Sequence, residues 1–123
     1  MARRDEPPGI FVVDDERIIA DTFSLILHAA GFRVTTFYDG SEVLKYPCES
    51  HPPDVVVTDL TMPNVDGLTL ASWLEKHYPN CRVVVVSGNQ AMLSQLAEAG
   101  CRFTLLSKPV NPAELIATVK SAI

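Results

Sequence analysis

Short, uninterrupted apolar runs constrain the fold of this chain more than any other feature. Runs of four apolar residues occur at 10–13 and 83–86, and consecutive valines occur at 55–57. Strands that are covered on both faces show such runs instead of alternation, and they are typical of a parallel sheet. The segment after the first run carries apolar residues at helical spacing, Ile19 and Phe23 among them. The pattern therefore predicts alternating strands and helices in an α/β domain.

Applied to the whole chain, this reasoning predicts five strands that alternate with five helices. The expected strands are 10–13, 34–37, 55–58, 83–86 and 103–106. The expected helices are about 19–30, 41–46, 68–78, 90–99 and a last one that Asn111 caps and Pro112 begins. Because βαβ crossovers are right-handed, we predict a doubly wound five-stranded parallel sheet with helices on both faces. The more polar second and fifth strands suit the edges, which fits the strand order 2-1-3-4-5.

The length and composition are those of one globular domain. The chain has 123 residues, of which 47% are apolar and 20% are charged, so it can bury a core and is not disordered. Pro7 and Pro8 indicate that residues 1–8 form a flexible leader. We therefore expect the folded domain to span residues 9–123.

Charge and cysteine usage exclude several classes of function. The 15 acidic and 10 basic residues give a net charge of −5, which disfavours direct binding to nucleic acid. The first apolar run is too short for a signal peptide or a membrane span, so we predict a cytoplasmic protein without membrane insertion. Cys48, Cys81 and Cys101 lack the paired spacing of a zinc site or a disulfide framework, and we expect them to be reduced.

Polar residues follow four of the expected strands. They are Asp14 and Asp15 after the first, Asp59 after the third, Ser87 after the fourth and Lys108 after the fifth. Because the carboxyl ends of parallel strands meet at one edge, we expect one crevice to hold all of these side chains. The carboxylates outnumber the ammonium group and would repel one another without a cation. Oxygen ligands of this kind favour Mg²⁺ or Mn²⁺ over zinc.

A metal ion, an ammonium group and a hydroxyl beside a carboxylate form the apparatus of phosphoryl transfer onto aspartate. Asp59 is the natural acceptor in this arrangement. We interpret Asp15 and Asp59 as metal ligands and Asp14 as a ligand or a supporting partner. Ser87 and Lys108 would contact the phosphoryl oxygens.

Each of these residues also has an ordinary structural interpretation. Asp14 or Asp15 could cap the first long helix, and Ser87 could serve only a turn. Lys108 could be a solvated loop lysine, and residues 62–63 could form an ordinary turn. Their coincidence at four strand ends favours the functional interpretation.

Two other functional classes are alternatives, and the first shares the predicted fold class. A flavin-binding module needs hydrogen-bond donors in its first phosphate loop, where this chain has Asp14, Asp15 and Glu16. An aspartate-nucleophile phosphatase acting on small substrates would carry a second aspartate where Glu16 stands. Both classes therefore fit the sequence less well.

The strand-end residues also form a recognisable set, namely Asp14 and Asp15, the segment 59–67 with the sequence DLTMPNVDG, Ser87, and Lys108 followed by Pro109. The set resembles the receiver domain of bacterial response regulators over about residues 9–123. This resemblance implies a flavodoxin-like fold and Mg²⁺-dependent transfer of a phosphoryl group to Asp59. The donor would be a histidine kinase or a phosphotransfer protein. Slow self-catalysed hydrolysis would follow, so the domain would not be a conventional enzyme.

The resemblance also assigns roles residue by residue. It makes Asp14 and Asp15 the acidic pair for the metal ion, and it makes the backbone carbonyl of Thr61 a further ligand. It also implies that the peptide bond between Lys108 and Pro109 is cis. In the family, an aromatic residue three positions before the lysine turns inward when the hydroxyl residue moves. That position is Leu105 here, so Ser87 and Leu105 are the predicted switch positions, and Phe103 lies on the same strand face as Leu105.

The resemblance implies an output face built from the fourth helix, the fifth strand and the fifth helix. Candidate contributors to it are Met92, Leu93, Leu105 and Val110. An effector domain, a downstream protein or a second copy of the chain would bind there. The alternative is a degenerate receiver that binds a partner without phosphorylation, and the aliphatic residue at Leu105 lends it some support.

Overall fold

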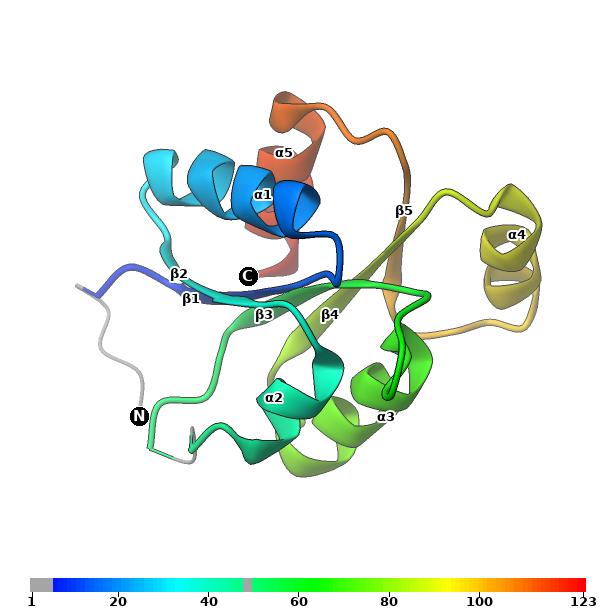
Figure 1. The fold of residues 1–123 in the computed structure, drawn as a ribbon, viewed down its shortest axis with the longest axis horizontal. Coiled ribbons are helices and arrows are strands. Elements are labelled where there is room, and N and C mark those ends of the chain that lie inside the picture. Colours follow the sequence, from blue (N-terminus) through cyan, green and yellow to red (C-terminus); the bar gives the residue numbers. More distant parts are fainter. Residues whose placement is uncertain (1–5, 48–49) are drawn as a thin grey trace.

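The computed structural model describes residues 6–47 and 50–123, and within them the chain forms five strands and five helices (Figure 1). The strands run parallel in the order β2-β1-β3-β4-β5, which confirms the predicted doubly wound fold. The strands are β1 (Gly9–Val13), β2 (Arg33–Phe37), β3 (Val55–Asp59), β4 (Arg82–Ser87) and β5 (Thr104–Ser107). The helices are α1 (Arg17–Ala29), α2 (Gly40–Lys45), α3 (Gly67–His77), α4 (Gln90–Glu98) and α5 (Pro112–Ala122).

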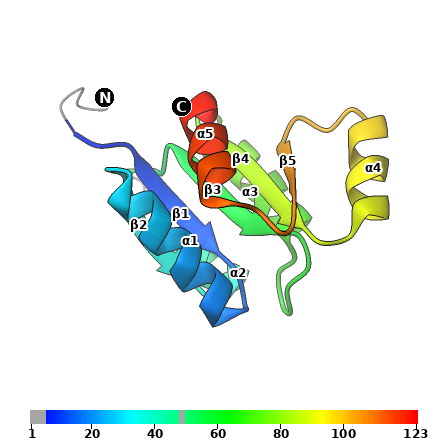
Figure 2. The same cartoon turned by 90° about the horizontal axis from the view of Figure 1, so that it is seen from above.

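Helices cover both faces of the sheet. α1 and α5 contact each other on one face, and α2 and α3 contact each other on the opposite face (Figures 1 and 2). α4 lies beside the edge strand β5 (Figure 2). Leu93 is the buried residue of α4, and Leu96 packs partly buried against the core beneath α3. α4 is therefore attached to the domain by a narrow apolar contact.

Alternate residues of the central strands enter two separate hydrophobic cores. In β1, Phe11 and Val13 pack beneath α2 and α3, whereas Ile10 and Val12 pack beneath α1 and α5. The valines of β3 and β4 divide between the two cores in the same way. A strand that is buried on both faces has no position that favours a polar side chain, and this explains the uninterrupted apolar runs.

Local capping sets the ends of the helices. Asn111 accepts a backbone hydrogen bond at 2.7 Å, and Pro112 occupies the first turn of α5, as predicted. The residue that caps α1 is Glu16, and its side chain makes no capping hydrogen bond. The interpretation in which Asp14 or Asp15 caps this helix is therefore wrong, because both residues precede the cap.

Two details differ from the sequence-based expectation. β5 begins at Thr104, so Phe103 precedes the strand instead of starting it. Phe103 still packs with Leu105 against the core beneath α3, as the shared strand face predicts. The prediction that Leu93 contributes to an exposed output face is wrong, because Leu93 is only 8% exposed and anchors α4. Met92 beside it is exposed.

The amino-terminal residues that the structure describes lie against the edge of the sheet. The carbonyls of Pro7 and Pro8 accept hydrogen bonds from the side chain and the backbone of Arg33, at 2.8 and 3.0 Å. Residues 1–5 of the predicted leader lie outside the described residues, as does Cys48. The division into a leader at 1–8 and a domain at 9–123 stays a prediction.

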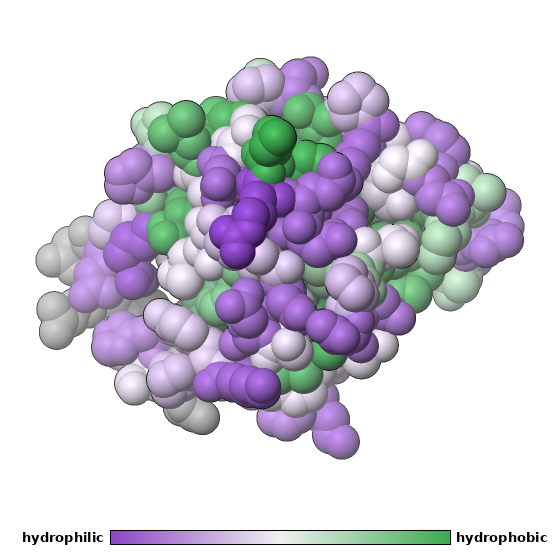
Figure 3. Space-filling model, viewed as in Figure 1, coloured by the Kyte–Doolittle hydropathy of each residue, from purple (hydrophilic) through white to green (hydrophobic). Residues whose placement is uncertain are grey.

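The surface is mainly hydrophilic on the face that Figure 3 shows, with separate hydrophobic patches over α1 and α5 and paler ones over α4. Among the residues that the structure describes, no helix combines the length and apolarity that a bilayer span requires. In the described part of the chain, Cys81 and Cys101 do not form a disulfide with each other.

Burial predicts that truncating two different apolar residues changes the free energy of unfolding by very different amounts. Leu74 on α3 is fully buried, whereas Ile18 on α1 is 83% exposed. Leu74→Ala should lower the free energy of unfolding by about 2–5 kcal/mol, because it leaves a cavity in the core. Ile18→Ala should change it by less than about 0.5 kcal/mol. Urea denaturation of both variants checks this, and equal losses would contradict the assignment of the core.

Candidate functional site

Three carboxylates meet at the carboxyl edge of the sheet. One ligand oxygen from each of Asp14, Asp15 and Asp59 lies within 4.8 Å of the others. Asp14 is 2% exposed and Asp59 is 9% exposed, whereas Asp15 faces solvent. The fold therefore brings together the acidic residues that the sequence places after the first and third strands.

Backbone pairing continues beyond the strands and holds these residues in place. The N–H of Asp14 donates to the carbonyl of Phe37 at 3.1 Å, and the N–H of Leu60 donates to the carbonyl of Val86 at 2.9 Å. One carboxylate oxygen of Asp14 accepts a hydrogen bond from the N–H of Glu16 at 2.9 Å, and its other oxygen faces the site. The positions of Asp14 and Asp59 are thus set by the backbone pairing of the sheet.

Lys108 balances part of this negative charge. Its Nζ lies 2.9 Å from Oδ1 of Asp59 and 3.3 Å from Oδ2 of Asp14. Its backbone N–H donates to the carbonyl of Ser87 at 2.8 Å, which extends the pairing of β5 with β4 to this edge. The peptide bond between Lys108 and Pro109 is cis, the isomer that the family resemblance implies.

Burial and the charges of the cluster together shift two pKa values. Burial raises the pKa of Asp59; the hydrogen bond from Lys108 opposes this shift, and the charge of Asp14 reinforces it. Burial disfavours the ammonium form of Lys108, but the contacts with Asp59 and Asp14 outweigh it and raise the pKa of Lys108. Both pKa values rise, which favours the charged form of Lys108 and the neutral form of Asp59, because one ammonium group serves several carboxylates. Lys108 therefore stays charged at neutral pH. The ionised form of Asp59 lowers the stability of the folded state.

Ser87 ends β4 at the same edge and is buried. Its Oγ accepts a hydrogen bond from the N–H of Asn89 at 2.9 Å. Oδ1 of Asn89 in turn accepts from the N–H of Met92 at 3.1 Å and caps α4. Ser87 therefore stabilises the turn, as its ordinary structural interpretation predicts. Because its oxygen acts as the acceptor here, its O–H can still donate a hydrogen bond to another group.

The loop after Asp59 folds back onto the strand that precedes it. The N–H of Gly67 donates to the carbonyl of Leu60 at 2.8 Å. A Cβ atom on Gly67 would lie 2.2 Å from the carbonyl oxygen of Asp59, so this approach requires glycine. Thr61, whose carbonyl is the further predicted ligand, lies in this loop and is exposed.

A second loop touches the loop that contains Thr61, and sequence reasoning does not single out the residues involved. Oδ2 of Asp39 accepts a hydrogen bond from Nδ2 of Asn64 at 2.8 Å. Asn64 has a φ of 68°, a conformation that asparagine tolerates better than most residues. An aspartate before Gly40 and an asparagine in a turn segment are common patterns, so only the fold shows that they meet.

The donor set fits a hard divalent cation. Carboxylate oxygens are the ligands that Mg²⁺ and Mn²⁺ prefer, and the cluster carries more negative charge than Lys108 balances. Asp14, Asp15 and Asp59 are therefore the residues positioned to hold such an ion.

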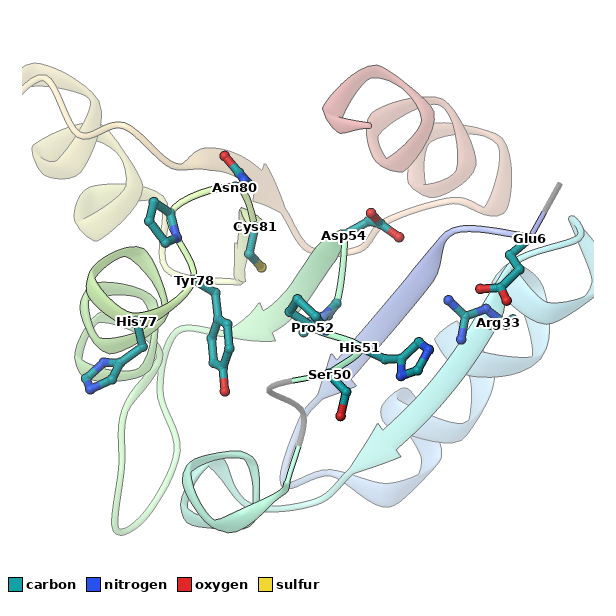
Figure 4. A pocket seen from close by; sticks show the side chains of 12 residues that line it. Glu6, Arg33, Ser50, His51, Pro52, Asp54, His77, Tyr78, Asn80 and Cys81 are labelled. Carbon is teal, nitrogen blue, oxygen red and sulfur yellow. The ribbon is translucent and has the colours of Figure 1, made fainter. Parts of the chain in front are cut away.

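A separate cavity of about 390 Å³ lies at the opposite end of the sheet (Figure 4). Its lining comes from the amino ends of β2, β3 and β4, with Arg33 and Asp54 among the polar side chains. Oδ2 of Asp54 accepts from the N–H of Gly9 at 2.8 Å, and Nε of Arg33 donates to the carbonyl of Pro7. These polar groups hold the starts of the strands together and are remote from the acidic cluster.

Comparison with known proteins identifies the family. Residues 10–120 match the family model described as the response regulator receiver domain. The chain belongs to this family. The receiver domain is 33% identical over 116 residues to the DNA-binding transcriptional regulator NtrC of Escherichia coli K12, a match that covers 93% of this chain and 24% of that protein. The chain spans between a quarter and a half of the length of the first curated relatives that it matches.

Solved structures of receiver domains have the same fold. A response regulator receiver domain protein from Clostridium thermocellum matches with a TM-score of 0.83 and 29% identity, covering 94% of both chains. The response regulator TrrA from Thermotoga maritima, in complex with Mg²⁺-BeF, matches with a TM-score of 0.81 and 28% identity. That match covers 94% of this chain and 99% of the other. The predicted flavodoxin-like receiver fold is confirmed.

Membership of the family establishes the general role of the domain. Receiver domains are signalling domains of two-component systems and not conventional enzymes, and they interact with histidine kinases and effector domains. They bind Mg²⁺ at an acidic site, and the cluster of Asp14, Asp15 and Asp59 fits such a site.

The raised pKa of Asp59 predicts how this carboxylate affects stability without metal. Because the folded pKa exceeds the unfolded value of 3.8, ionised Asp59 destabilises the fold above the folded pKa, and the penalty disappears below the unfolded value. In chelator at about pH 7, Asp59→Asn should therefore raise the melting temperature by roughly a few degrees. The gain should shrink toward about pH 4. Calorimetry across this range checks it, and a lower melting temperature for the variant at neutral pH would contradict it.

Gly67 and Gly88 provide a steric comparison within the site. Gly67→Ala should lower the free energy of unfolding by roughly 2–4 kcal/mol, because its Cβ meets the backbone of Asp59. Gly88→Ala places a Cβ 4.0 Å from Cβ of Lys108, which is ordinary contact, and should cost less than about 1 kcal/mol. Urea denaturation distinguishes the two variants. Similar losses of stability would show that the fold does not depend on the close approach of Gly67 to the backbone of Asp59.

Proposed function

We propose that this receiver domain accepts a phosphoryl group on Asp59 in a Mg²⁺-dependent reaction. The donor would be a histidine kinase or a phosphotransfer protein. The observation that carries the proposal is the 2.9 Å contact between Nζ of Lys108 and Oδ1 of Asp59, inside a cluster with two further carboxylates. Such a site combines a nucleophilic oxygen with positive charge for the incoming phosphoryl group.

The carboxylate of Asp59 is the nucleophile of the proposed transfer. One of its oxygens forms a bond to phosphorus, while the bond from phosphorus to the donor's histidine nitrogen breaks and that nitrogen keeps the electron pair. When bound, Mg²⁺ would neutralise charge on the phosphoryl oxygens, and Asp14, Asp15, Asp59 and the carbonyl of Thr61 would hold it. Water in the same site would hydrolyse the acyl phosphate slowly and return the domain to its starting state.

Lys108 and Ser87 are the proposed contacts to the phosphoryl oxygens. The raised pKa of Lys108 keeps its ammonium group charged at neutral pH, so it can form charge-assisted hydrogen bonds. Oγ of Ser87 already accepts a hydrogen bond from Asn89, and its O–H remains available to donate. The two residues therefore supply two hydrogen-bond donors, one from the end of β4 and one from the residue after β5.

Ser87 and Leu105 are the proposed switch positions. Leu105 is partly buried against the core, and this chain therefore has an aliphatic side chain where the family uses an aromatic one. The proposed output face comprises α4, β5 and α5, where Met92 is exposed and Val110 is partly buried. An effector domain, a downstream protein or a second copy of the chain would bind there. On the family's properties we also propose that the protein acts in the cytoplasm.

A phosphorylation-independent binding module is the alternative. Leu105 is the residue that favours it, since the usual aromatic coupling is missing. The acceptor, its neighbouring acids and Lys108 are nevertheless assembled in one site. We therefore favour phosphorylation over the alternative.

Intact-mass measurement tests the proposed acceptor. After incubation with a small acyl phosphate and Mg²⁺, the protein should gain one phosphoryl group, and Asp59→Asn should gain none. A chelator should also abolish the adduct. Asp54→Asn provides the matched control, because Asp54 directly precedes the same strand at its opposite end and the amide can still accept the hydrogen bond from Gly9.

One outcome would contradict the proposed acceptor, and a second would require a further measurement. An adduct retained in Asp59→Asn would show that another residue is the acceptor. No adduct in the native protein, despite Mg²⁺ binding and a short quench time, would favour either rapid hydrolysis or the phosphorylation-independent module. Phosphate release from the acyl phosphate separates these two, because only a hydrolysing receiver releases it faster than Asp59→Asn does.

A further inference from the structure

The loop between Asp59 and α3 contains a strained turn. The N–H of Val65 donates to the carbonyl of Pro63 at 2.8 Å, which closes a three-residue turn around Asn64. With a φ of 68° at Asn64, this is the rarer and more strained form of γ-turn. Strained conformations persist only where their surroundings hold them. A contact that stabilises this turn therefore also stabilises the conformation of the loop around it.

The turn between β2 and α2 provides that contact. Oδ2 of Asp39 accepts from Nδ2 of Asn64 at 2.8 Å. The following residue, Gly40, lies so close to the loop that a Cβ there would be 2.9 Å from the carbonyl oxygen of Val65. The two turns therefore meet through both a side-chain hydrogen bond and close backbone packing.

Asp39 is itself held firmly. Its Oδ1 accepts a hydrogen bond from the N–H of Ser41 at 2.9 Å and caps α2. Hydrogen bonds from the Ser41 backbone and from Asn64 lower the pKa of Asp39, so its carboxylate is ionised at neutral pH. One oxygen thus anchors Asp39 to its own helix, and the other reaches across to Asn64.

We propose that Asp39 is a positioning residue whose carboxylate holds Asn64 and thereby fixes the loop that presents the carbonyl of Thr61 to the metal ion. The proposal rests on the proposed function, because it assigns Thr61 the role of ligand. Thr61 and Asn64 belong to the same short loop, which Gly67 closes on Leu60. A displacement of Asn64 therefore shifts the backbone that carries the ligand oxygen.

Two substitutions separate positioning from helix capping. Asp39→Ser keeps a good capping group for α2 but is too short to reach Asn64. The exchange Asp39→Asn with Asn64→Asp reverses donor and acceptor, so the hydrogen bond can form again without a change in net charge. Aspartate also tolerates positive φ, so position 64 accepts it. Asn64→Gly removes the same hydrogen bond by deleting its donor. This variant replaces Asp39→Ser in both measurements if Asp39→Ser does not fold.

Amide exchange in chelator measures the loop without any metal or phosphoryl group. By NMR, the amides of Val65 and Gly67 should exchange faster in Asp39→Ser than in the native protein. We expect roughly a three- to tenfold change, which corresponds to the net contribution of one typical hydrogen bond. Amides of α2 should keep their native rates, and the exchanged pair should restore native rates in the loop.

Titration calorimetry with Mg²⁺ provides the second measurement. Asp39→Ser should bind Mg²⁺ roughly three- to tenfold more weakly, and the exchanged pair should bind within about twofold of the native protein. Glu42→Gln is the control for charge, because it removes one negative charge from α2 without touching Asn64. Its effect on Mg²⁺ affinity should be smaller than that of Asp39→Ser.

Three outcomes would overturn the proposal. The first is unchanged loop exchange and unchanged Mg²⁺ affinity in Asp39→Ser and Asn64→Gly. The second is an exchanged pair that folds but fails to restore the loop. The third is a loss of Mg²⁺ affinity in Glu42→Gln as large as in Asp39→Ser. None of these measurements depends on phosphorylation, so the absence of a phosphoryl adduct would contradict the proposed function alone.

Discussion

Buried negative charge at the carboxyl edge of the sheet is the constraint on which the rest of this structure depends. Asp14 and Asp59 are almost inaccessible to solvent, and Lys108 is the ammonium group that touches both. Charges removed from water must be paired, and one cation for several carboxylates leaves the pairing incomplete. The raised pKa of Asp59 expresses this imbalance. The fold thus maintains an unfavourable arrangement whose energy a metal ion can lower.

The architecture explains how such an arrangement persists. Central strands packed between two hydrophobic cores provide a rigid base, and backbone pairing extends past their ends to Asp14 and Leu60. On the side of β2 and β3, two turns support each other through Asp39 and Asn64. On the side of β4, the turn at Ser87 leads directly into α4, which Leu93 anchors with few other buried groups. The rigid elements hold the charges, and the less firmly attached helix follows the turn that starts at Ser87.

The sequence predicted the strand order and the helices on both faces of the sheet, because the apolar runs report strands that are buried on two faces. It also placed Asp59 and Lys108 at the same edge, since parallel strands carry their carboxyl ends together. The placement of Leu93 on the output face was wrong, because the family resemblance locates that face on α4 without showing which of its apolar residues is buried. It also left open whether Asp14 caps the first helix, and the structure shows that Glu16 occupies that position instead.

The sequence by itself determined the α/β alternation, the family and the set of polar residues at the strand ends. These follow from local patterns, namely hydrophobic periodicity and residues at fixed offsets from each strand. Only the tertiary structure decided the contacts between loops, such as the one that joins Asp39 to Asn64. The balance of charge that raises the pKa of Asp59 was decided in the same way. Both depend on distances between segments far apart in the chain and on exclusion of water, which no local pattern encodes.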